Sequence, residues 1–201
     1  MTEENYQKNI KSSEILGRIL FPGKEIKKKV KELGNKITHD YSGKELIIVC
    51  ILRGAVVFLT DLIKHIDLPL SIDFMSISSY GFSTTDSGLV KITKDLDENI
   101  EGKHVLIVED IIDTGLTLSY MIRNLQLREP ASIEICALID RKVRRIANIK
   151  IKYSAFQLEE KYVVGYGLDY KQKYRNLESI YELKTYTVKK DIESLKSSLN
   201  K

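Results

Sequence analysis

Three uninterrupted apolar runs of strand length most constrain how this chain can fold. They are ELIIVCI (45–51), HVLIVED (104–110) and SIEICALI (132–139), and none alternates between apolar and polar positions. A strand that is apolar on both faces is buried on both, which is typical of a parallel sheet covered by helices on each side. Segments with helical patterns separate the runs. The sequence therefore predicts an α/β fold with a central, mainly parallel sheet flanked by helices.

The pattern of the remaining segments agrees with this fold class. Residues 24–40 place Ile26, Val30, Leu33 and Ile37 at helical spacing, between Pro22 and a Ser-Gly pair. Further helices are expected at 55–67 and 116–126, and further strands at 70–78 and near 153–156, 162–164 and 179–183. The Ser-, Thr- and Gly-rich residues 79–90 lack periodicity and are expected to form a long mobile loop. The polar residues 188–201 are expected to form a tail.

Composition sets limits on the class of protein. A chain of 201 residues favours one domain, 1–201, and a net charge of +4 is too small to argue for nucleic-acid binding. No stretch approaches the roughly 18 apolar residues of a membrane span, and the polar start is unlike a signal peptide. Cys50 and Cys136 lie inside apolar runs, which indicates buried, reduced thiols and a cytoplasmic protein.

The segment VEDIIDTGLT (108–117) places acids beside a small turn where a buried strand ends. In open α/β sheets, ligands bind beyond the carboxyl ends of the strands. A glycine in the turn lets the backbone approach a ligand, the hydroxyls of Thr114 and Thr117 add donors, and the start of the next helix favours an anion. The turn is not a Walker A loop, because it contains no Gly-Lys-Ser/Thr.

A phosphate would be repelled by nearby carboxylates, so Glu109 and Asp110 are expected to face another part of the ligand. Vicinal sugar hydroxyls are suitable partners, because a carboxylate accepts hydrogen bonds from them. A ligand with a phosphate at one end and a ribose diol in the middle fits both halves of the segment. The alternative interpretation is an acidic strand end followed by a capped helix, without a ligand.

These motifs resemble those of the type I phosphoribosyltransferases. VEDIIDTGLT resembles the family's motif for phosphoribosyl pyrophosphate (PRPP), Leu52-Arg53-Gly54 its pyrophosphate loop, and Ser79-Tyr80-Gly81 the start of its mobile catalytic loop. YVVGYGLDYKQKYRNL (162–177) resembles the purine-binding segment of hypoxanthine-guanine phosphoribosyltransferases. The resemblance covers roughly residues 15–183. It implies a core of about 44–160 and a small hood built from the terminal segments, about 1–20 and 161–201.

The resemblance implies a reaction in which a 6-oxopurine, hypoxanthine or guanine, displaces pyrophosphate from PRPP in the presence of Mg²⁺. Glu109 and Asp110 would hold the ribose hydroxyls, directly or through the metal. Asp113 would exchange a proton with purine N7 as general base or acid. The 5′-phosphate would be bound by the turn residues Asp113, Thr114, Gly115, Leu116 and Thr117.

The same resemblance assigns roles outside the turn. Arg53, Gly54 and Arg175 would contact the pyrophosphate, and Asp169 would bind a second Mg²⁺ close to the purine. The peptide bond after Leu52 can be cis in this family.

Purine binding and closure are also implied by the resemblance. Tyr162 would stack on the purine, Val163 would read its edge through the main chain, and Ile111 would form an apolar floor. Ser79 and Tyr80 would belong to a lid over 79–90 that keeps water from the reacting carbon.

The segment after 132–139 departs from the family pattern. The family has a lysine here that donates to the 6-oxo group, whereas this chain reads DRKVRR (140–145). Register favours Arg141 as the donor and chemistry favours Lys142, so both remain candidates. A nucleic-acid patch is the alternative interpretation of these basic residues.

Two alternatives remain to be distinguished, one from another class of protein and one an enzyme with a different base. A nucleotide-sensing regulator of this fold would bind RNA or DNA and would be expected to carry an extended basic surface. An enzyme of the same kind could instead take xanthine, because contacts at the purine 2-position decide that choice. The purine-binding segment disfavours adenine and pyrimidines. The expected partners are small molecules, without nucleic acid or membrane, and the resemblance implies a homodimer or homotetramer.

Overall fold

The computed structural model describes residues 15–79 and 90–184. The chain divides into two compact units, one comprising Met1–Gly23 with Lys161–Lys201 and the other comprising Lys24–Glu160. The expected tail at 188–201 lies outside the described residues. Among the described residues, no helix combines the length and apolar character needed to cross a bilayer.

A six-stranded sheet forms the centre of the larger unit, and its strand order is β4-β3-β2-β5-β6-β7. The strands are β2 (Leu46–Leu52), β3 (Leu70–Ser79), β4 (Val90–Lys94), β5 (His104–Ile112), β6 (Ser132–Asp140) and β7 (Tyr153–Gln157). All neighbours pair in parallel except β3 and β4, which are antiparallel. The predicted mainly parallel α/β fold is therefore confirmed, and the carboxyl ends of β2, β5 and β6 meet at one edge.

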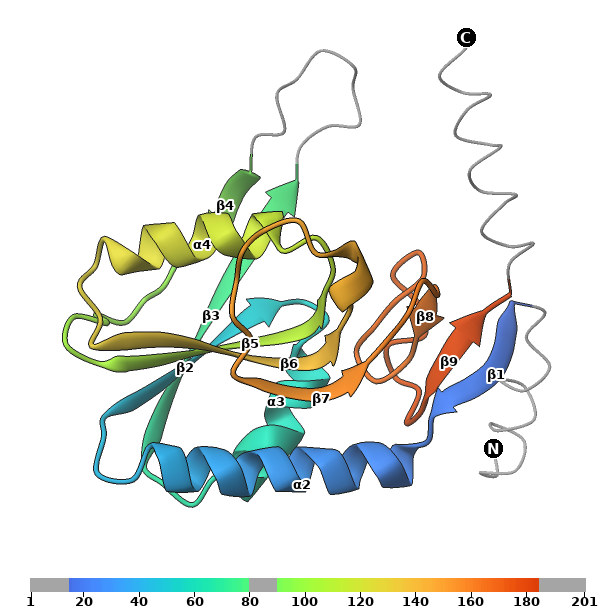
Figure 1. The fold of residues 1–201 in the computed structure, drawn as a ribbon, viewed down its shortest axis with the longest axis horizontal. Coiled ribbons are helices and arrows are strands. Elements are labelled where there is room, and N and C mark those ends of the chain that lie inside the picture. Colours follow the sequence, from blue (N-terminus) through green and yellow to red (C-terminus); the bar gives the residue numbers. More distant parts are fainter. Residues whose placement is uncertain (1–14, 80–89, 185–201) are drawn as a thin grey trace, which may run out of the picture. The chain divides into compact units, whose positions relative to one another are not determined.

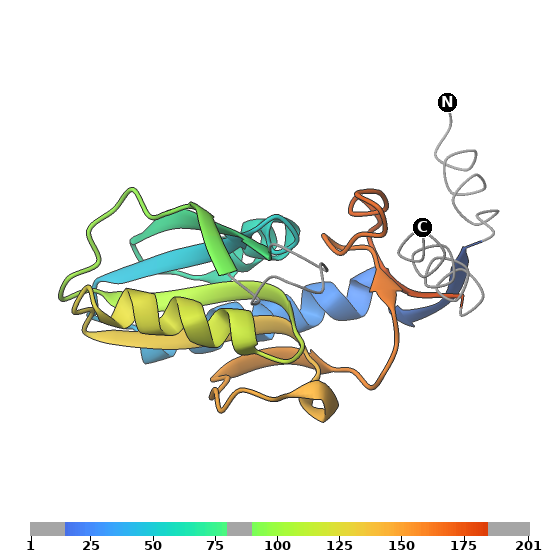
Figure 2. The same ribbon diagram turned by 90° about the horizontal axis from the view of Figure 1, so that it is seen from above.

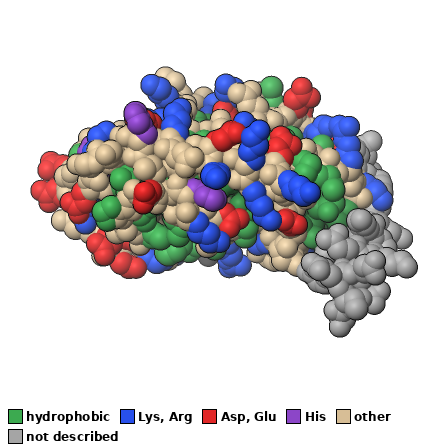
Figure 3. All heavy atoms as spheres, turned by 90° about the horizontal axis from the view of Figure 1, so that it is seen from below, with side chains coloured by type: hydrophobic (Ala, Val, Ile, Leu, Met, Phe, Trp, Pro, Cys, Tyr) green, Lys and Arg blue, Asp and Glu red, His purple; other side chains and the backbone are tan. Residues whose placement is uncertain are grey.

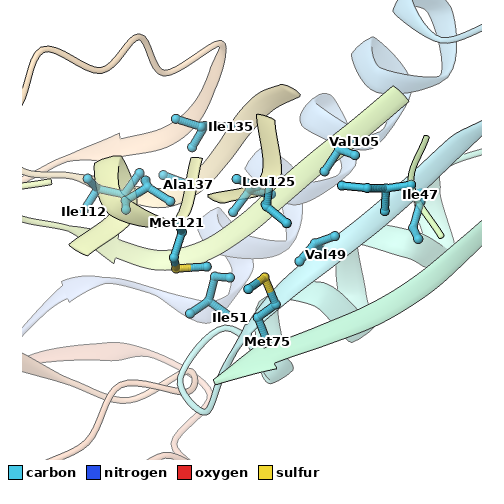
Figure 4. Close-up of a cluster of buried hydrophobic side chains, with 13 residues drawn as sticks. Ile47, Val49, Ile51, Met75, Val105, Ile112, Met121, Leu125, Ile135 and Ala137 are labelled. Atoms are coloured by element: carbon cyan, nitrogen blue, oxygen red, sulfur yellow. The ribbon is translucent and has the colours of Figure 1, made fainter. Parts of the chain in front are cut away.

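Helices cover both faces of this sheet (Figures 1 and 2). Helix α4 (Leu116–Gln126) lies along β5 and β6 on one face, and α2 (Gly23–Asp40) and α3 (Val56–Leu62) lie on the other. Figure 4 shows Met121 and Leu125 of α4 packed over alternate residues of the strands, such as Val49 and Ala137. The continuous apolar runs are explained by this arrangement, because one set of strand residues faces α4 and the other faces α2 and α3.

Helix α2 follows its predicted pattern closely. Ile26, Val30, Leu33 and Ile37 are all buried, so the apolar stripe faces the sheet while the lysines between them face solvent. The helix ends at Asp40, shortly before Gly43, which adopts a positive φ of 72°.

The prediction of a helix over 55–67 was wrong at its end. Helix α3 stops at Leu62, a 3₁₀ turn η1 (Ile63–His65) follows, and Ile66 is extended. Pro69 lies just beyond, and a proline disfavours helical geometry in the residue before it. A second 3₁₀ turn, η2 (Lys142–Arg144), follows β6.

The smaller unit contains a three-stranded antiparallel sheet of order β1-β9-β8. Its strands are β1 (Leu16–Phe21), β8 (Val163–Val164) and β9 (Ile180–Leu183). Leu16, Val164, Leu177 and Leu183 form its apolar cluster. Between β8 and β9 the chain forms tight turns, and four non-glycine residues there have positive φ. Neither β1 nor β4 was predicted as a strand.

A buried carboxylate joins β3 to the segment that follows β4. Asp73 is 4% exposed, and its two oxygens accept hydrogen bonds from the backbone N–H groups of Phe74 (2.6 Å), Asp97 (2.8 Å) and Glu98 (2.9 Å). Burial alone would raise the pKa of Asp73, but these N–H donors and the nearby Lys94 outweigh it and lower the pKa below the usual range. The carboxylate thus stabilises the fold in its ionised form.

We expect Asp73→Asn to lower the free energy of unfolding by roughly 1.5–3 kcal/mol at pH 7, because charge-assisted hydrogen bonds are lost. A depressed folded-state pKa contributes stability above the ordinary Asp pKa of about 4, and the contribution is lost as pH falls through the lower folded value. Urea denaturation at pH 7 and pH 3 measures this, and the difference from the parent should shrink at pH 3. Asp97→Asn, in the same segment with an exposed side chain, is the control and should change stability by less than about 1 kcal/mol. Equal effects of the two variants at pH 7 would contradict the account.

Candidate active site

The candidate site is built on the corner between β5 and α4. The strand continues to Ile112, two residues further than predicted, so Glu109 and Asp110 lie within it and next to β6. Gly115 is the residue before α4 and has a φ of 75°, a left-handed conformation that favours glycine. Residues 113–115 therefore form a short turn that leads directly into the helix N-terminus.

The two acids on β5 influence each other strongly. Burial of its carboxyl group raises the pKa of Glu109 well above the usual range, and the adjacent Asp110 raises it further. Burial and the same two acids also raise the pKa of Cys50, on the neighbouring strand β2, to about 12, so this thiol stays protonated. A cation or hydroxyl donor beside the two carboxyl groups would favour their ionised forms.

The predicted pyrophosphate loop lies against this acid pair. The Leu52–Arg53 peptide bond is cis, as the resemblance implied. A Cβ atom at Gly54 would overlap the Oδ2 atom of Asp110, so the absence of a side chain at Gly54 leaves room for the Asp110 carboxylate in its present position. The structure thus brings the loop at 52–54 and the acids at 109–110 together.

Asp113 lies between Arg141, which sequence analysis placed in the site, and Arg144, which it did not. Its Oδ2 atom is 3.4 Å from Nη1 of Arg141 and 3.1 Å from Nη1 of Arg144. Its Oδ1 atom is buried and has no hydrogen-bond partner among the described residues. Both arginines therefore orient the carboxylate through the same oxygen, Oδ2.

The two candidates for the 6-oxo donor differ in position. Arg141 is 6% exposed and reaches Asp113, whereas Lys142 begins the exposed turn η2. Of the pair, the structure brings Arg141 into the corner.

Arg145 is the residue that sequence analysis missed most clearly. Its Nε donates to the carbonyl oxygen of Asp113 (3.0 Å), and its Nη2 donates to the carbonyl of Ile112 (3.4 Å) and to Asp140 Oδ1 (2.6 Å). The signal that could have identified it is its place just beyond the carboxyl end of β6, next to the strand that carries the acids.

The remaining residues of the turn are arranged around the helix start. Leu116 and Thr117 are exposed, and the Thr114 hydroxyl lies 3.5 Å from the Leu116 amide. Ile111, the expected apolar floor, is partly buried, and its N–H donates to Asp110 Oδ1 at 2.8 Å.

Four predicted site residues lie in the smaller unit. Asp169 and Arg175 form an ion pair with 2.7 Å between Oδ1 and Nη2, so the expected metal ligand and the expected pyrophosphate ligand are paired with each other. Tyr162 is 52% exposed, which suits a stacking surface, and Val163 is paired with Glu182 in the sheet. Of the expected lid residues, Ser79 ends β3 and Tyr80 lies outside the described residues.

The acid pair has the chemistry required for Mg²⁺. This ion is commonly held by one or two carboxylates together with substrate phosphates, rather than by a complete protein cage. Within residues 15–79 and 90–184, no three His, Cys, Asp or Glu side chains gather into a metal-binding group. Glu109 and Asp110 therefore fit an ion that arrives with a phosphorylated substrate.

Gly115 provides a test of the turn geometry. A Cβ atom there would lie 2.8 Å from Ile149 Cδ1 and 3.1 Å from Arg145 Cδ, whereas one at Gly102, with a similar φ of 70°, would meet nothing within 4 Å. We expect Gly102→Ala to lower the free energy of unfolding by about 1–2 kcal/mol through φ alone. Gly115→Ala should lower it further, because the Cβ atom forces Ile149, Arg145 or the turn itself to shift, and it should also weaken ribose 5-phosphate binding. Urea denaturation and calorimetric titration with ribose 5-phosphate measure both effects. Identical behaviour of the two variants would refute the crowding argument.

Comparison with known proteins identifies the family. Residues 18–171 match the model of the phosphoribosyl transferase domain. The chain is 50% identical over 167 residues to the hypoxanthine-guanine phosphoribosyltransferase of Bacillus subtilis, covering 83% of this chain and 93% of that protein. It is 46% identical over 170 residues to a hypoxanthine-guanine-xanthine phosphoribosyltransferase of Tritrichomonas foetus, covering 84% and 92%.

A solved structure gives the same result. The crystal structure of a hypoxanthine phosphoribosyltransferase from Staphylococcus aureus superposes with a TM-score of 0.84 at 45% identity, covering 92% of this chain and 98% of that one. A family model that spans most of the chain, close relatives and a shared fold agree with the arrangement of acids and turn on β5, and the chain belongs to the phosphoribosyltransferase family.

Proposed function

We propose that this protein transfers the 5-phosphoribosyl group from PRPP to hypoxanthine and guanine. The products would be the nucleoside 5′-monophosphate and pyrophosphate, as in purine salvage. The names of the relatives from Bacillus subtilis and Staphylococcus aureus support this choice of substrates. The observation that carries the proposal is the β5–α4 corner, where two carboxylates, a helix-start turn and an oriented aspartate follow one another within nine residues of chain.

The corner suits the two ends of a ribose 5-phosphate group. Glu109 and Asp110 can accept hydrogen bonds from the ribose 2′ and 3′ hydroxyls. The turn at 113–115 and the first residues of α4 provide N–H groups at the positive end of a helix, which favours a phosphate. The separation of the acids from the turn lets one ligand satisfy both without placing its phosphate against the carboxylates.

Asp113 is suited to proton exchange with the purine. In the reaction, the bond from the ribose anomeric carbon to the pyrophosphate oxygen breaks, and the electron pair leaves with pyrophosphate. A ring nitrogen of the purine forms the new bond to that carbon, and the purine becomes a better nucleophile as its N7 proton shifts to a carboxylate. The Asp113 carboxylate, whose side chain is 37% exposed, is the acceptor we assign to this proton. The arginines on Oδ2 hold the side chain in place.

Mg²⁺ is the cofactor we propose, held on the protein side by Glu109 and Asp110. When bound, it would neutralise charge on the pyrophosphate leaving group. We also propose that Asp169 binds a second Mg²⁺. Pyrophosphate would be contacted by Arg53, Gly54 and Arg175.

Arg141 is our choice for the donor to the purine 6-oxo group. It is buried and reaches the same Asp113 that faces the purine in this proposal, whereas Lys142 is exposed. Tyr162, Val163 and Ile111 remain the proposed purine contacts.

The cellular setting and assembly are proposed from less specific observations. Cys50 and Cys136 are free and buried, which fits the reducing cytoplasm. A homodimer or homotetramer remains the expectation drawn from the family.

A nucleic-acid-binding regulator is less well supported. On the face drawn in Figure 3, basic and acidic side chains of the described residues are interspersed. The basic residues Arg141, Arg144 and Arg145 are engaged with Asp113 and Asp140, rather than forming an unopposed cluster.

The direct test offers hypoxanthine, guanine, xanthine, adenine and uracil separately with PRPP and Mg²⁺ while nucleotide and pyrophosphate formation are followed. We expect turnover with hypoxanthine and guanine, none with adenine or uracil, and loss of turnover when a chelator removes Mg²⁺. Xanthine turnover would place the chain with the Tritrichomonas relative in its base range. Turnover with adenine or uracil alone, or with no base, would overturn the proposal.

We expect Asp113→Asn to lower kcat about 10²–10⁴-fold, the usual contribution of a positioned acid or base, while PRPP still binds. Steady-state kinetics and PRPP titration measure these two quantities. The control is Asp61→Asn, which removes a surface carboxylate paired with Lys64 and should leave both unchanged. An Asp113→Asn enzyme as active as the parent would rule out the proton-transfer role.

A further inference from the structure

The segment after β6 hydrogen-bonds to three consecutive carbonyl groups, that of Ile112 at the end of β5 and those of Asp113 and Thr114 in the candidate phosphate-binding turn. The Ile112 carbonyl accepts from the N–H of Arg141 (3.0 Å) and from the Arg145 side chain. The Asp113 carbonyl accepts from Nε of Arg145 (3.0 Å). The Thr114 carbonyl accepts from the N–H groups of Ile146 (2.9 Å) and Ala147 (3.0 Å). All three carbonyl groups are therefore directed toward residues 141–147.

Because the peptide bond is planar, the direction of each carbonyl group also fixes the direction of the N–H group of the next residue. In a trans peptide, the C=O of one residue and the N–H of the next point in opposite directions. When the carbonyls of Ile112, Asp113 and Thr114 face residues 141–147, the N–H groups of Asp113, Thr114 and Gly115 face the other way. These are the first amide donors that a phosphate at the turn would meet.

Arg145 is itself held in place. Its side chain is 15% exposed, and its Nη2 lies 2.6 Å from Oδ1 of Asp140, whose side chain is 5% exposed. Gly115 lies close against the Arg145 side chain, because a Cβ atom there would be 3.1 Å from Cδ. The planar guanidinium thus binds a carboxylate and two carbonyls at once, which a lysine ammonium could not do with the same geometry.

We propose that Arg145, held by Asp140, is a positioning residue that sets the direction of the phosphate-binding amides. It does not touch the substrate in this proposal. It acts through the peptide groups after Ile112 and Asp113, whose carbonyl oxygens accept hydrogen bonds from its guanidinium. The inference rests on the proposed function, because it assigns the amides to the 5′-phosphate.

The test compares Arg145→Met, Arg145→Lys and Asp140→Asn with the parent in the full chain. We expect Arg145→Met to weaken ribose 5-phosphate binding about 10- to 100-fold, which corresponds to losing one or two of the hydrogen bonds from the turn amides to the phosphate. KM for PRPP should rise similarly, while KM for hypoxanthine should change less than about twofold. Arg145→Lys should fall between Arg145→Met and the parent, and Asp140→Asn should act in the same direction.

Arg128→Met is the matched control. Arg128 forms an ion pair with Asp95 at 2.6 Å, and it follows the far end of α4, about 16 Å from the turn at 1.5 Å per residue. Thermal unfolding of every variant separates loss of fold from loss of binding. If Arg145→Met does not fold, Arg145→Lys decides the question.

Two outcomes overturn the inference, and they are distinguishable from failure of the proposed function. The inference is overturned if Arg145→Met binds ribose 5-phosphate as tightly as the parent. If Arg145→Met does not fold, the same result with Arg145→Lys overturns the inference. An equal loss in that variant and in Arg128→Met would do the same. A parent protein that neither binds ribose 5-phosphate nor consumes PRPP would overturn the proposed function instead, and with it this inference.

Discussion

The hydrogen bonds from residues 141–147 to the carbonyls of Ile112, Asp113 and Thr114 constrain the site more than any other interaction. The peptide group is planar, so fixing the carbonyls also fixes the amides on the opposite side. The same segment carries Arg141 and Arg144 to the side chain of Asp113. The turn, the helix start and the proposed acid–base residue are therefore held by one stretch of chain.

Charge is distributed unequally along the corner. Glu109 and Asp110 lie together on β5, and their mutual repulsion combined with burial raises the pKa of Glu109. At Asp113, the positive charges of two guanidinium groups offset the negative charge of the carboxylate. In our proposal, this difference separates the part of the site that receives hydroxyls and a cation from the part that receives a phosphate and a purine. Gly54, which lies against Asp110, brings the proposed pyrophosphate loop to the first part.

The predictable elements are the strands that are buried on both faces and the helices that bury one clear apolar stripe. Strands β2, β5 and β6 and helices α2 and α4 were identified because their apolar residues form the core. Strand β4 was missed because VKITK is short and antiparallel at the sheet edge, and β1 because LGRILF has only one buried residue. The end of the helix expected at 55–67 depended on a 3₁₀ turn that apolar spacing does not encode.

For the candidate site, the motifs that are contiguous in sequence could be predicted, whereas the contacts between distant segments could not. The acids and the glycine turn form one contiguous motif, so the sequence indicated them directly, and the resemblance to the family added the loop at 52–54. The contacts of Arg144 and Arg145 depend on how the chain turns back after β6 through η2. In the sequence, DRKVRR has the appearance of a solvated basic segment, and only the tertiary structure pairs Arg145 with Asp140.

A crystal structure of the protein with inosine 5′-monophosphate would test the central claim most directly. We predict that the phosphate oxygens lie within hydrogen-bond distance of the Thr114 and Gly115 amides. The ribose hydroxyls should face Glu109 and Asp110, and the carbonyls of Ile112 to Thr114 should still be bound by residues 141–147. A phosphate bound elsewhere, or a turn whose carbonyls have rotated toward the ligand, would contradict the account.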